Sequence, residues 1–159
     1  MRTLVRGPAV ALAVLGVVLP ASGPARARDL PRQVQAEIDA DIRECRPEKV
    51  VLGRGFVSQR DVNGDGTPDF ILDYGAFQCG DRAAFYCGSG GCTTKVFVST
   101  GRNGYAKVFD EIVRGMQFRT VNGRPAMMLN LHGSACGKVG AEPCGKTLTW
   151  NGTRFASAR

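Results

Sequence analysis

The sequence predicts an α+β domain in which an N-terminal helix is followed by a disulfide-stapled antiparallel β-meander. Three observations support this fold class. The part of the chain that follows an apolar N-terminal segment begins with apolar residues at the spacing of one helix. Short runs rich in β-branched and aromatic residues come next, separated by glycine-containing turns, and six cysteines are spread among these elements. Elements in this order form one layered domain with one modest core.

The first 27 residues have the pattern of a secretory signal peptide. Arg2 and Arg6 form its positive end, residues 9–19 form an apolar run of eleven, and a small-x-small site allows cleavage after Ala27 or, alternatively, after Ala25. The apolar run is too short to span a bilayer, so we expect no transmembrane segment after cleavage. Residues 28–159 are then a single mature domain in the bacterial periplasm or outside the cell.

The net charge of the chain is modest once this segment is removed. Residues 1–27 contain three arginines and no acid, so the net charge falls from +7 to +4. The remaining basic residues are scattered, with no run of three or more. This pattern lacks a cluster of basic residues that could bind phosphate groups, and we expect no nucleic-acid partner.

The first predicted element of the mature chain is a helix over residues 29–45. Asp29 can cap this helix, Pro31 suits its first turn and Pro47 stops it. Apolar residues recur at spacings of four, four and three, which predicts one face packed on the core. This stripe consists of Val34, Ile38, Ile42 and Cys45. The other face is expected to be solvated, with Arg32, Gln35, Glu37, Asp39, Asp41 and Arg43.

Residues 61–69 contain the most specific motif in the chain. Oxygen-bearing side chains fall at positions 1, 3, 5 and 9 of this run and a glycine falls at position 6, which is the ligand spacing of an EF-hand-type calcium loop. Ca²⁺ takes oxygen ligands, and closely spaced carboxylates repel one another unless a cation lies between them. The predicted ligands are the side chains of Asp61, Asn63, Asp65 and Asp69 and the backbone carbonyl of Thr67.

The motif departs from a full EF-hand. Leu72 stands at position 12 in place of the bidentate glutamate, and Asp73 can serve only if the backbone bends. The flanking residues 53–60 contain two glycines, and residues 70–74 have the pattern of a short strand. We therefore expect one weak, structural Ca²⁺ site in a loop between two strands. A plain polar turn is the alternative, since Asn-Gly and Asp-Gly are good turn formers.

A disulfide-held loop and a pair of strands are expected after the calcium loop. Residues 75–92 are rich in glycine, cysteine and aromatic residues, which predicts a tight loop closed by a disulfide. Residues 93–100 have high β-propensity, residues 101–104 form a turn, and residues 105–113 return as a strand. We expect the inward residues of the returning strand to be Tyr105, Val108 and Ile112.

Two hairpins complete the predicted meander. Asn122-Gly123 between two apolar-rich runs is a strong hairpin signal, and it predicts a hairpin over residues 117–131. Asn151-Gly152 predicts a second hairpin over residues 146–156. A glycine-rich loop bounded by cysteine, residues 132–144, lies between the two hairpins.

All six cysteines lie in the mature part: Cys45, Cys79, Cys87, Cys92, Cys136 and Cys144. An even number in an exported chain predicts three disulfides, but six cysteines allow fifteen pairings, so the sequence alone leaves the pairing open. Short loops favour the pairs Cys87–Cys92 and Cys136–Cys144, and Cys45–Cys79 would then tie the helix to the sheet. A zinc site is the alternative, although the chain has no Cys-x-x-Cys pair and a single histidine.

Residues 61–69 resemble the Asp-x-Asp-x-Asp-Gly-x-x-Asp loops of FG-GAP and VCBS-type extracellular repeats, in which the ninth-position aspartate closes the site without a glutamate. With Cys-Gly-Ser-Gly-Gly-Cys at residues 87–92 and Gly-Tyr-x-x-Val-Phe at residues 104–109, the layout is similar to a kind of small exported bacterial protein. The resemblance covers the middle third of the chain. It implies an exported location and a bound Ca²⁺ rather than an activity.

Catalytic signals are weak in this sequence, which has no phosphate loop and no cofactor fingerprint. His132, the only histidine, stands two residues before Ser134, and neighbours this close in a loop seldom form a nucleophile–base pair. A carboxylate pair among the remaining acids stays open: Asp73, Asp81, Asp110 and Glu111. We expect a binding or structural role rather than catalysis.

An inhibitor of a cell-wall hydrolase such as lysozyme is the alternative function. Some exported lysozyme inhibitors insert a loop containing Ser-Gly into the enzyme's cleft, and Ser89-Gly90-Gly91 beside Tyr86 loosely resembles such a loop. The basic mature chain weakens this reading, because lysozymes are commonly basic and like charges repel. The sequence names no partner, but an exported location favours a periplasmic or cell-surface protein.

Overall fold

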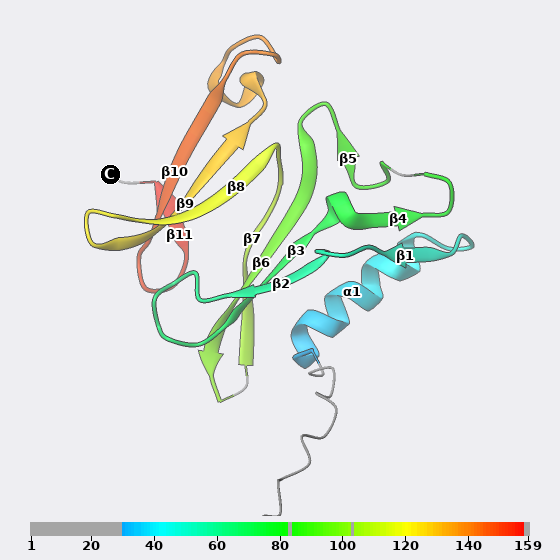
Figure 1. Ribbon diagram of the computed structural model, residues 1–159, viewed down its shortest axis with the longest axis horizontal. Helices are drawn as coiled ribbons and strands as arrows, with labels where there is room; N and C mark the ends of the chain where they lie inside the picture. Colours follow the sequence, from blue (N-terminus) through cyan, green and yellow to red (C-terminus); the bar gives the residue numbers. More distant parts are fainter. Residues whose placement is uncertain (1–29, 83, 103, 158–159) are drawn as a thin grey trace, which may run out of the picture.

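The computed structural model describes residues 30–82, 84–102 and 104–157. The predicted signal peptide and Asp29 lie outside the described residues. The described residues form one α-helix, two short 3-10 helices (Tyr74–Ala76 and Gly133–Cys136) and eleven strands in three antiparallel sheets (Figure 1). The predicted α+β class, with a helix preceding antiparallel strands and three disulfides, is confirmed.

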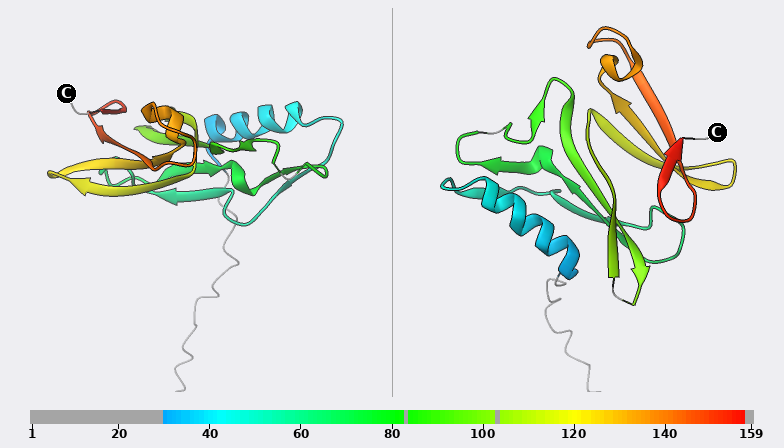
Figure 2. Two further views of the ribbon diagram at one scale, coloured as in Figure 1. Left: turned by 90° about the horizontal axis from the view of Figure 1, so that it is seen from above. Right: turned by 180° about the vertical axis from the view of Figure 1, so that it is seen from behind.

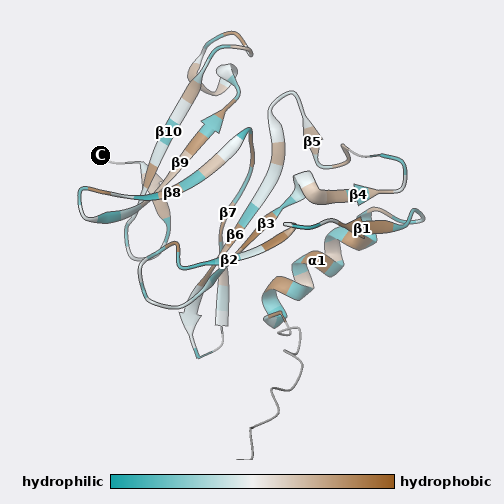
Figure 3. Cartoon of the chain, in the orientation of Figure 1, coloured by the Kyte–Doolittle hydropathy of each residue, from teal (hydrophilic) through white to brown (hydrophobic). Residues whose placement is uncertain are grey.

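Helix α1 (Arg32–Glu44) starts after the extended residue Pro31, which stands just before the first turn rather than inside it. The predicted apolar stripe is confirmed, because Val34, Ile38 and Cys45 are buried. Apolar and polar residues alternate along the helix (Figure 3). The stripe faces the central sheet and anchors the N-terminal part of the molecule on it.

The central sheet has the strand order β2-β3-β6-β5, and β7 also pairs with β6. Its strands are β2 (Val57–Arg60), β3 (Asp69–Asp73), β5 (Cys87–Gly88), β6 (Gly91–Gly101) and β7 (Gly104–Val113). A small sheet beside it consists of β1 (Val50–Leu52) and β4 (Phe77–Cys79). The candidate calcium loop connects β2 to β3, so its predicted place between two strands is confirmed.

One of the three residues that we predicted to face inward on β7 does not, whereas Tyr105 and Val108 pack against the two cores as expected. We expected Ile112 to face the core, but it is 54 % exposed, whereas Phe109 and Val113 are buried. The pairing of β7 with β6 skips Val108 at a register shift. Because successive strand residues point to opposite faces, one extra residue exchanges the inward and outward positions beyond it.

The C-terminal sheet is a meander with the order β11-β10-β9-β8. Its strands are β8 (Gly115–Val121), β9 (Arg124–Leu131), β10 (Cys144–Trp150) and β11 (Phe155–Ser157). The hairpin predicted at Asn122-Gly123 is confirmed. The φ angles of these two residues are 51° and 74°, and a two-residue type I′ turn requires both to be positive.

Two cores lie on opposite faces of the central sheet, where we expected one. Phe70 and Leu72 of β3 belong to the core shared with α1, and Ile71 between them packs against the core shared with the C-terminal sheet. Figure 2 shows α1 on one side of the central strands. The alternation of side chains along β3 therefore divides the apolar residues between two layers.

The three disulfides are the two favoured by loop length, Cys87–Cys92 and Cys136–Cys144, and the remaining pair, Cys45–Cys79. Cys45–Cys79 joins the end of α1 to β4, as predicted. The alternative zinc site is wrong, because all six cysteines are consumed in these bonds.

We expected one face of α1 to be solvated, but two of its acids are buried or half-buried. Asp41 is 5 % exposed and Glu37 is half-buried. Both bind the ammonium group of Lys95 on β6, at 2.9 Å and 2.8 Å, and Lys95 is 6 % exposed. Tyr74 also donates its hydroxyl to Asp41. Buried charges are tolerated only when they are paired, so these bonds fix the position of α1 on the sheet.

Replacing Lys95 by methionine should destabilise the protein strongly. The change leaves the Asp41 carboxylate buried without a cation, which costs about 3–5 kcal/mol. Lys107→Met is the matched control, because Lys107 also binds Glu37 but its side chain is 34 % exposed, and such a pair contributes less than about 1 kcal/mol. Urea unfolding gives both values, and equal losses for the two variants would contradict the assigned role of Lys95.

Acid should weaken the bonds of Glu37. Burial tends to raise the pKa of Glu37, but hydrogen bonds from Lys107 and Lys95 outweigh it and hold the pKa below its ordinary value of 4.5. The contribution of Glu37 is therefore complete above about pH 4.5 and is lost as the pH falls through the lower folded pKa. The unfolding free energy of wild type should fall more steeply on acidification than that of Glu37→Gln. Parallel pH profiles for the two proteins would refute this.

Candidate functional site

The loop between β2 and β3 packs against the C-terminal sheet. Val62 is buried in the core beneath that sheet, and a Cβ atom on Gly64 would lie 3.1 Å from Pro125 Cγ on β9. Gly64 and Gly66 have φ angles of 79° and 81°, which favour glycine and allow the loop to reverse direction twice. The loop therefore bridges the two larger sheets.

Three of the predicted ligand side chains fold back on the loop itself. Asp61 accepts hydrogen bonds from the N–H groups of Gly64, at 2.7 Å, and Gly66, at 2.9 Å. Asn63 accepts from the N–H of Asp65, and Asp65 accepts from the N–H of Thr67. Side chains that bond backbone two to five residues later hold a loop in one turn conformation.

Asp69, the fifth predicted ligand, is fully buried at the first position of β3. Its two carboxylate oxygens accept from the N–H of Val62, at 2.9 Å, and from the N–H of Ser99, at 2.8 Å. Burial raises the pKa of Asp69, and the charges of Asp65 and Asp61 add to this rise, which the two N–H bonds only partly oppose. The negative charge of Asp69 is thus poorly compensated in the folded chain.

The donor atoms of the loop suit a hard cation, because the predicted set is all oxygen and each carboxylate oxygen keeps a lone pair beyond the N–H that it accepts. None of the three loop aspartates takes part in a salt bridge in the described part of the chain. No group of three or more Asp, Glu, His or Cys side chains converges closely enough to hold a metal among the described residues. Binding of Ca²⁺ thus requires the loop carboxylates to turn toward a common point.

Asp73 lies away from the loop. It ends β3, four residues beyond Asp69, and a strand rises about 3.3 Å per residue, so roughly 13 Å separate the two positions. The Asp73 carboxylate caps the following 3-10 helix by accepting from the N–H of Gly75 at 2.9 Å. The set of predicted ligands is therefore confined to residues 61–69.

The loop containing Ser89 meets the loop containing His132 at one end of the molecule. A Cβ atom on Gly90 would lie 4.0 Å from His132 Cβ and 3.3 Å from Ile112 Cγ2. The guanidinium group of Arg114 donates two hydrogen bonds to the carbonyl of Ser89, at 2.9 Å and 3.2 Å. The sequence shows neither approach, because both join residues more than twenty positions apart.

His132 and Ser134 do reach each other, contrary to our expectation. The Nδ1 atom of His132 lies 2.7 Å from Ser134 Oγ and also accepts from the Ser134 N–H, which caps the 3-10 helix Gly133–Cys136. The other side of the ring lies against Gly140, whose hypothetical Cβ would be 2.3 Å from Nε2. In this geometry the His132 side chain caps the short helix.

Comparisons with models of known protein families, with curated proteins and with solved structures found no match to this chain. In the described ranges, no helix has both the length and the apolar character needed to cross a membrane.

Removing the Asp69 carboxylate should destabilise the fold even without metal. Asp69→Ala leaves the N–H groups of Val62 and Ser99 without their acceptor, at a cost of roughly 2 kcal/mol or more. Asp65→Ala, at an exposed position of the same loop, should cost less than about 1 kcal/mol. Urea unfolding in the presence of a chelator separates this effect from metal binding, and similar losses for both variants would count against it.

Proposed function

We propose that the mature chain is an exported calcium-binding module with a binding or structural role rather than a catalytic one. The observation that carries the proposal is the loop of residues 61–69, where five oxygen donors stand in calcium-ligand register and three aspartates have no cationic partner among the described residues. We propose Asp61, Asn63, Asp65, Asp69 and the carbonyl of Thr67 as the ligands of one ion.

A bound Ca²⁺ would supply positive charge at the centre of the loop. The chain's own residues would couple the loop to the rest of the fold. Asp69 connects the loop to β6 through Ser99, and Gly64 packs against Pro125, so the loop's conformation is coupled to both larger sheets. Metal binding and folding are then linked, because the ligands come together only in the folded chain.

The site should be weak and structural. With Leu72 in place of the bidentate glutamate, the affinity belongs with the ~10⁻⁴–10⁻³ M dissociation constants of extracellular modules. Such a site is filled where calcium is plentiful and is a poor signalling device. Three disulfides fit an extracellular or periplasmic protein. Export by the segment of residues 1–27 is part of the proposal.

Calcium should raise the thermal unfolding midpoint of the oxidised residues 28–159. At a calcium concentration of about one hundred times the dissociation constant, the expected stabilisation is about 2.7 kcal/mol. Magnesium is the control ion, because it demands a tight octahedral site and gives up water reluctantly. If neither ion changed the unfolding midpoint, residues 61–69 would be a polar turn and not a calcium site.

Two variants test which residues bind the ion. Asp65→Ala should remove the response to calcium, because it deletes a central ligand that is exposed and inessential to the fold. Asp73→Ala removes an equal charge at the far end of β3 and should keep the full response, measured as the shift of its own midpoint. If Asp65→Ala bound calcium as well as wild type does, the ligand assignment would be wrong.

The second candidate is inhibition of a cell-wall hydrolase such as lysozyme by the loop Ser89-Gly90-Gly91. The observation in its favour is that this loop is closed by Cys87–Cys92 and held by Arg114, and a loop ordered before binding loses little entropy on binding. A lysozyme assay with added mature protein tests it. Full activity at a large excess of the protein would dismiss this candidate.

A further inference from the structure

Strand β8 has an edge without a partner. It is an outer strand of the C-terminal sheet and pairs with β9 alone within the described residues. Arg60 of β2 donates a guanidinium N–H to the carbonyl of Phe118 at 3.3 Å, so the backbone groups of Phe118 point away from β9. Backbone direction alternates along an antiparallel strand, so Met116 and Thr120 point the same way. A free edge of this kind can pair with another strand.

A groove runs along this edge. Its largest part has a volume of about 580 Å³, lies between β8 and the β2–β3 hairpin, and is lined in part by Arg60, Ile71, Phe118 and Arg119. Cavities of about 340 Å³ and 150 Å³ extend it along β8 in the two directions, and each shares lining residues with it. The groove thus follows the whole length of the strand.

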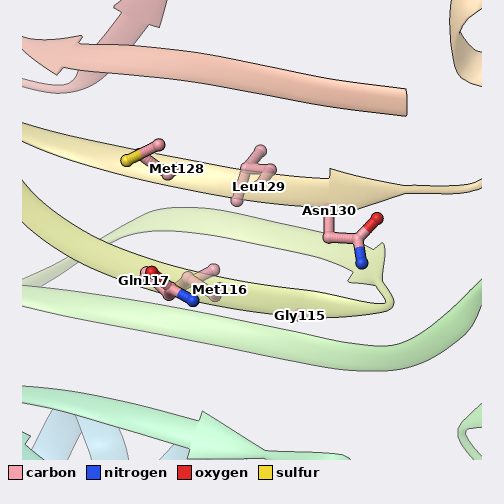
Figure 4. Close-up of a pocket in the computed structure, with 6 residues that line it drawn as sticks. All are labelled: Gly115, Met116, Gln117, Met128, Leu129 and Asn130. Carbon is pink, nitrogen blue, oxygen red and sulfur yellow. The ribbon is translucent and has the colours of Figure 1, made fainter. Parts of the chain in front are cut away.

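The groove borders apolar surface. A further hollow of about 320 Å³ lies over β8 and β9, where Met116 of β8 lies near Met128 and Leu129 of β9 (Figure 4). Met128 is exposed, and Met116 is half-buried. By register Met116 is opposite Leu129 and packs toward the core side, whereas Met128 is opposite Gln117 and points to the other face. Of the two methionines only Met116 lines the groove beside β8, where its adaptable side chain can take up an apolar partner.

Charge is unevenly divided between the two parts of the chain. Residues 114–157, which include the C-terminal sheet, contain six basic residues and one acid, Glu142. The described residues before them contain ten basic and twelve acidic residues. The largest part of the groove is lined by Arg60 and Arg119 and by no acid of the described chain, whereas Asp73 and Asp61 line its two ends. Neither arginine is in a salt bridge within the described residues.

We propose that the groove beside β8 binds an extended acidic segment of a partner protein, which adds to the β8 edge as a further strand. The segment's backbone would bond the outward groups of Met116, Phe118 and Thr120, and Arg60 would exchange the Phe118 carbonyl for a carboxylate. Its side chains would alternate between apolar residues facing the core side and acids facing Arg119. The smaller end of the groove is lined by Asp61, Val62 and Gly64 of the candidate calcium loop, but the strand pairing itself needs no bound ion.

The charges select this occupant over a second copy of the chain. Two copies joined β8 to β8 would bring Arg60 and Arg119 of one copy toward the same arginines of the other, and like charges across strands are destabilising. An acidic segment gives each arginine a partner instead. Complementary charge of this kind favours specificity and fast association.

The test is selection from a random heptapeptide library displayed on phage, with the oxidised mature protein as the immobilised target. Enriched peptides should carry acids at alternate positions. A synthetic copy of an enriched peptide should bind wild type roughly tenfold or more tightly than it binds the variant Arg60→Gln/Arg119→Gln, as measured by calorimetry. Methylation of alternate backbone nitrogens in the peptide should abolish binding, because a β8 pairing needs those N–H groups.

The control variant Arg102→Gln/Arg154→Gln removes the same charge from two turns outside the groove and should bind as wild type does. Thermal unfolding confirms that each variant is folded, and Arg119→Lys, which keeps the charge, should retain most of the affinity. The proposal is overturned by the absence of enrichment over the bare support, by enriched peptides without acids, by binding that survives methylation, or by a dimer of the protein that dissociates when β8 is altered.

Discussion

The buried carboxylate of Asp69 ties the loop of residues 61–69 to the strands β3 and β6. It begins β3, accepts from Val62 at the start of the loop, and accepts from Ser99 on β6. A charge in a dry position is costly unless hydrogen bonds surround it, and two N–H donors meet only part of that cost. The loop and two strands of the central sheet are arranged around this group, and Val62 and Gly64 of the loop extend the connection to the C-terminal sheet.

The two layers on the central sheet are attached by different physical means. Helix α1 is held by its apolar stripe and by the buried Lys95–Asp41 pair, which has direction and excludes other placements of the helix. The C-terminal sheet is held by apolar packing of Met127 and Leu129, among others, and by the loop that carries Val62. Apolar contact fixes position less strictly than a paired charge does.

Local patterns predicted much of this fold. The spacing of Val34 and Ile38 predicted the helix and its buried face, and Asn122-Gly123 predicted its hairpin, because both signals depend on residues a few positions apart. The burial of Asp41 and the exposure of Ile112 were not predicted. The first depends on Lys95, which lies 54 positions away, and the second on a register shift between two strands. Pairings of that kind leave no mark in a short window of sequence.

At the candidate site, too, local features could be predicted from the sequence and long-range ones could not. The ligand register of residues 61–69 is visible in the sequence because all five donors are local. That Asp69 is fully buried and that the Ser89 and His132 loops meet are tertiary facts. The free edge of β8 is likewise a property of topology, since the strand's own residues do not reveal how many neighbours it has.

None of the three cross-links joins residues 30–113 to residues 114–157. Cys45–Cys79 and Cys87–Cys92 lie before that boundary, and Cys136–Cys144 lies after it. The contacts between the central and C-terminal sheets are therefore non-covalent apart from the chain itself, so the two sheets can separate with every disulfide intact.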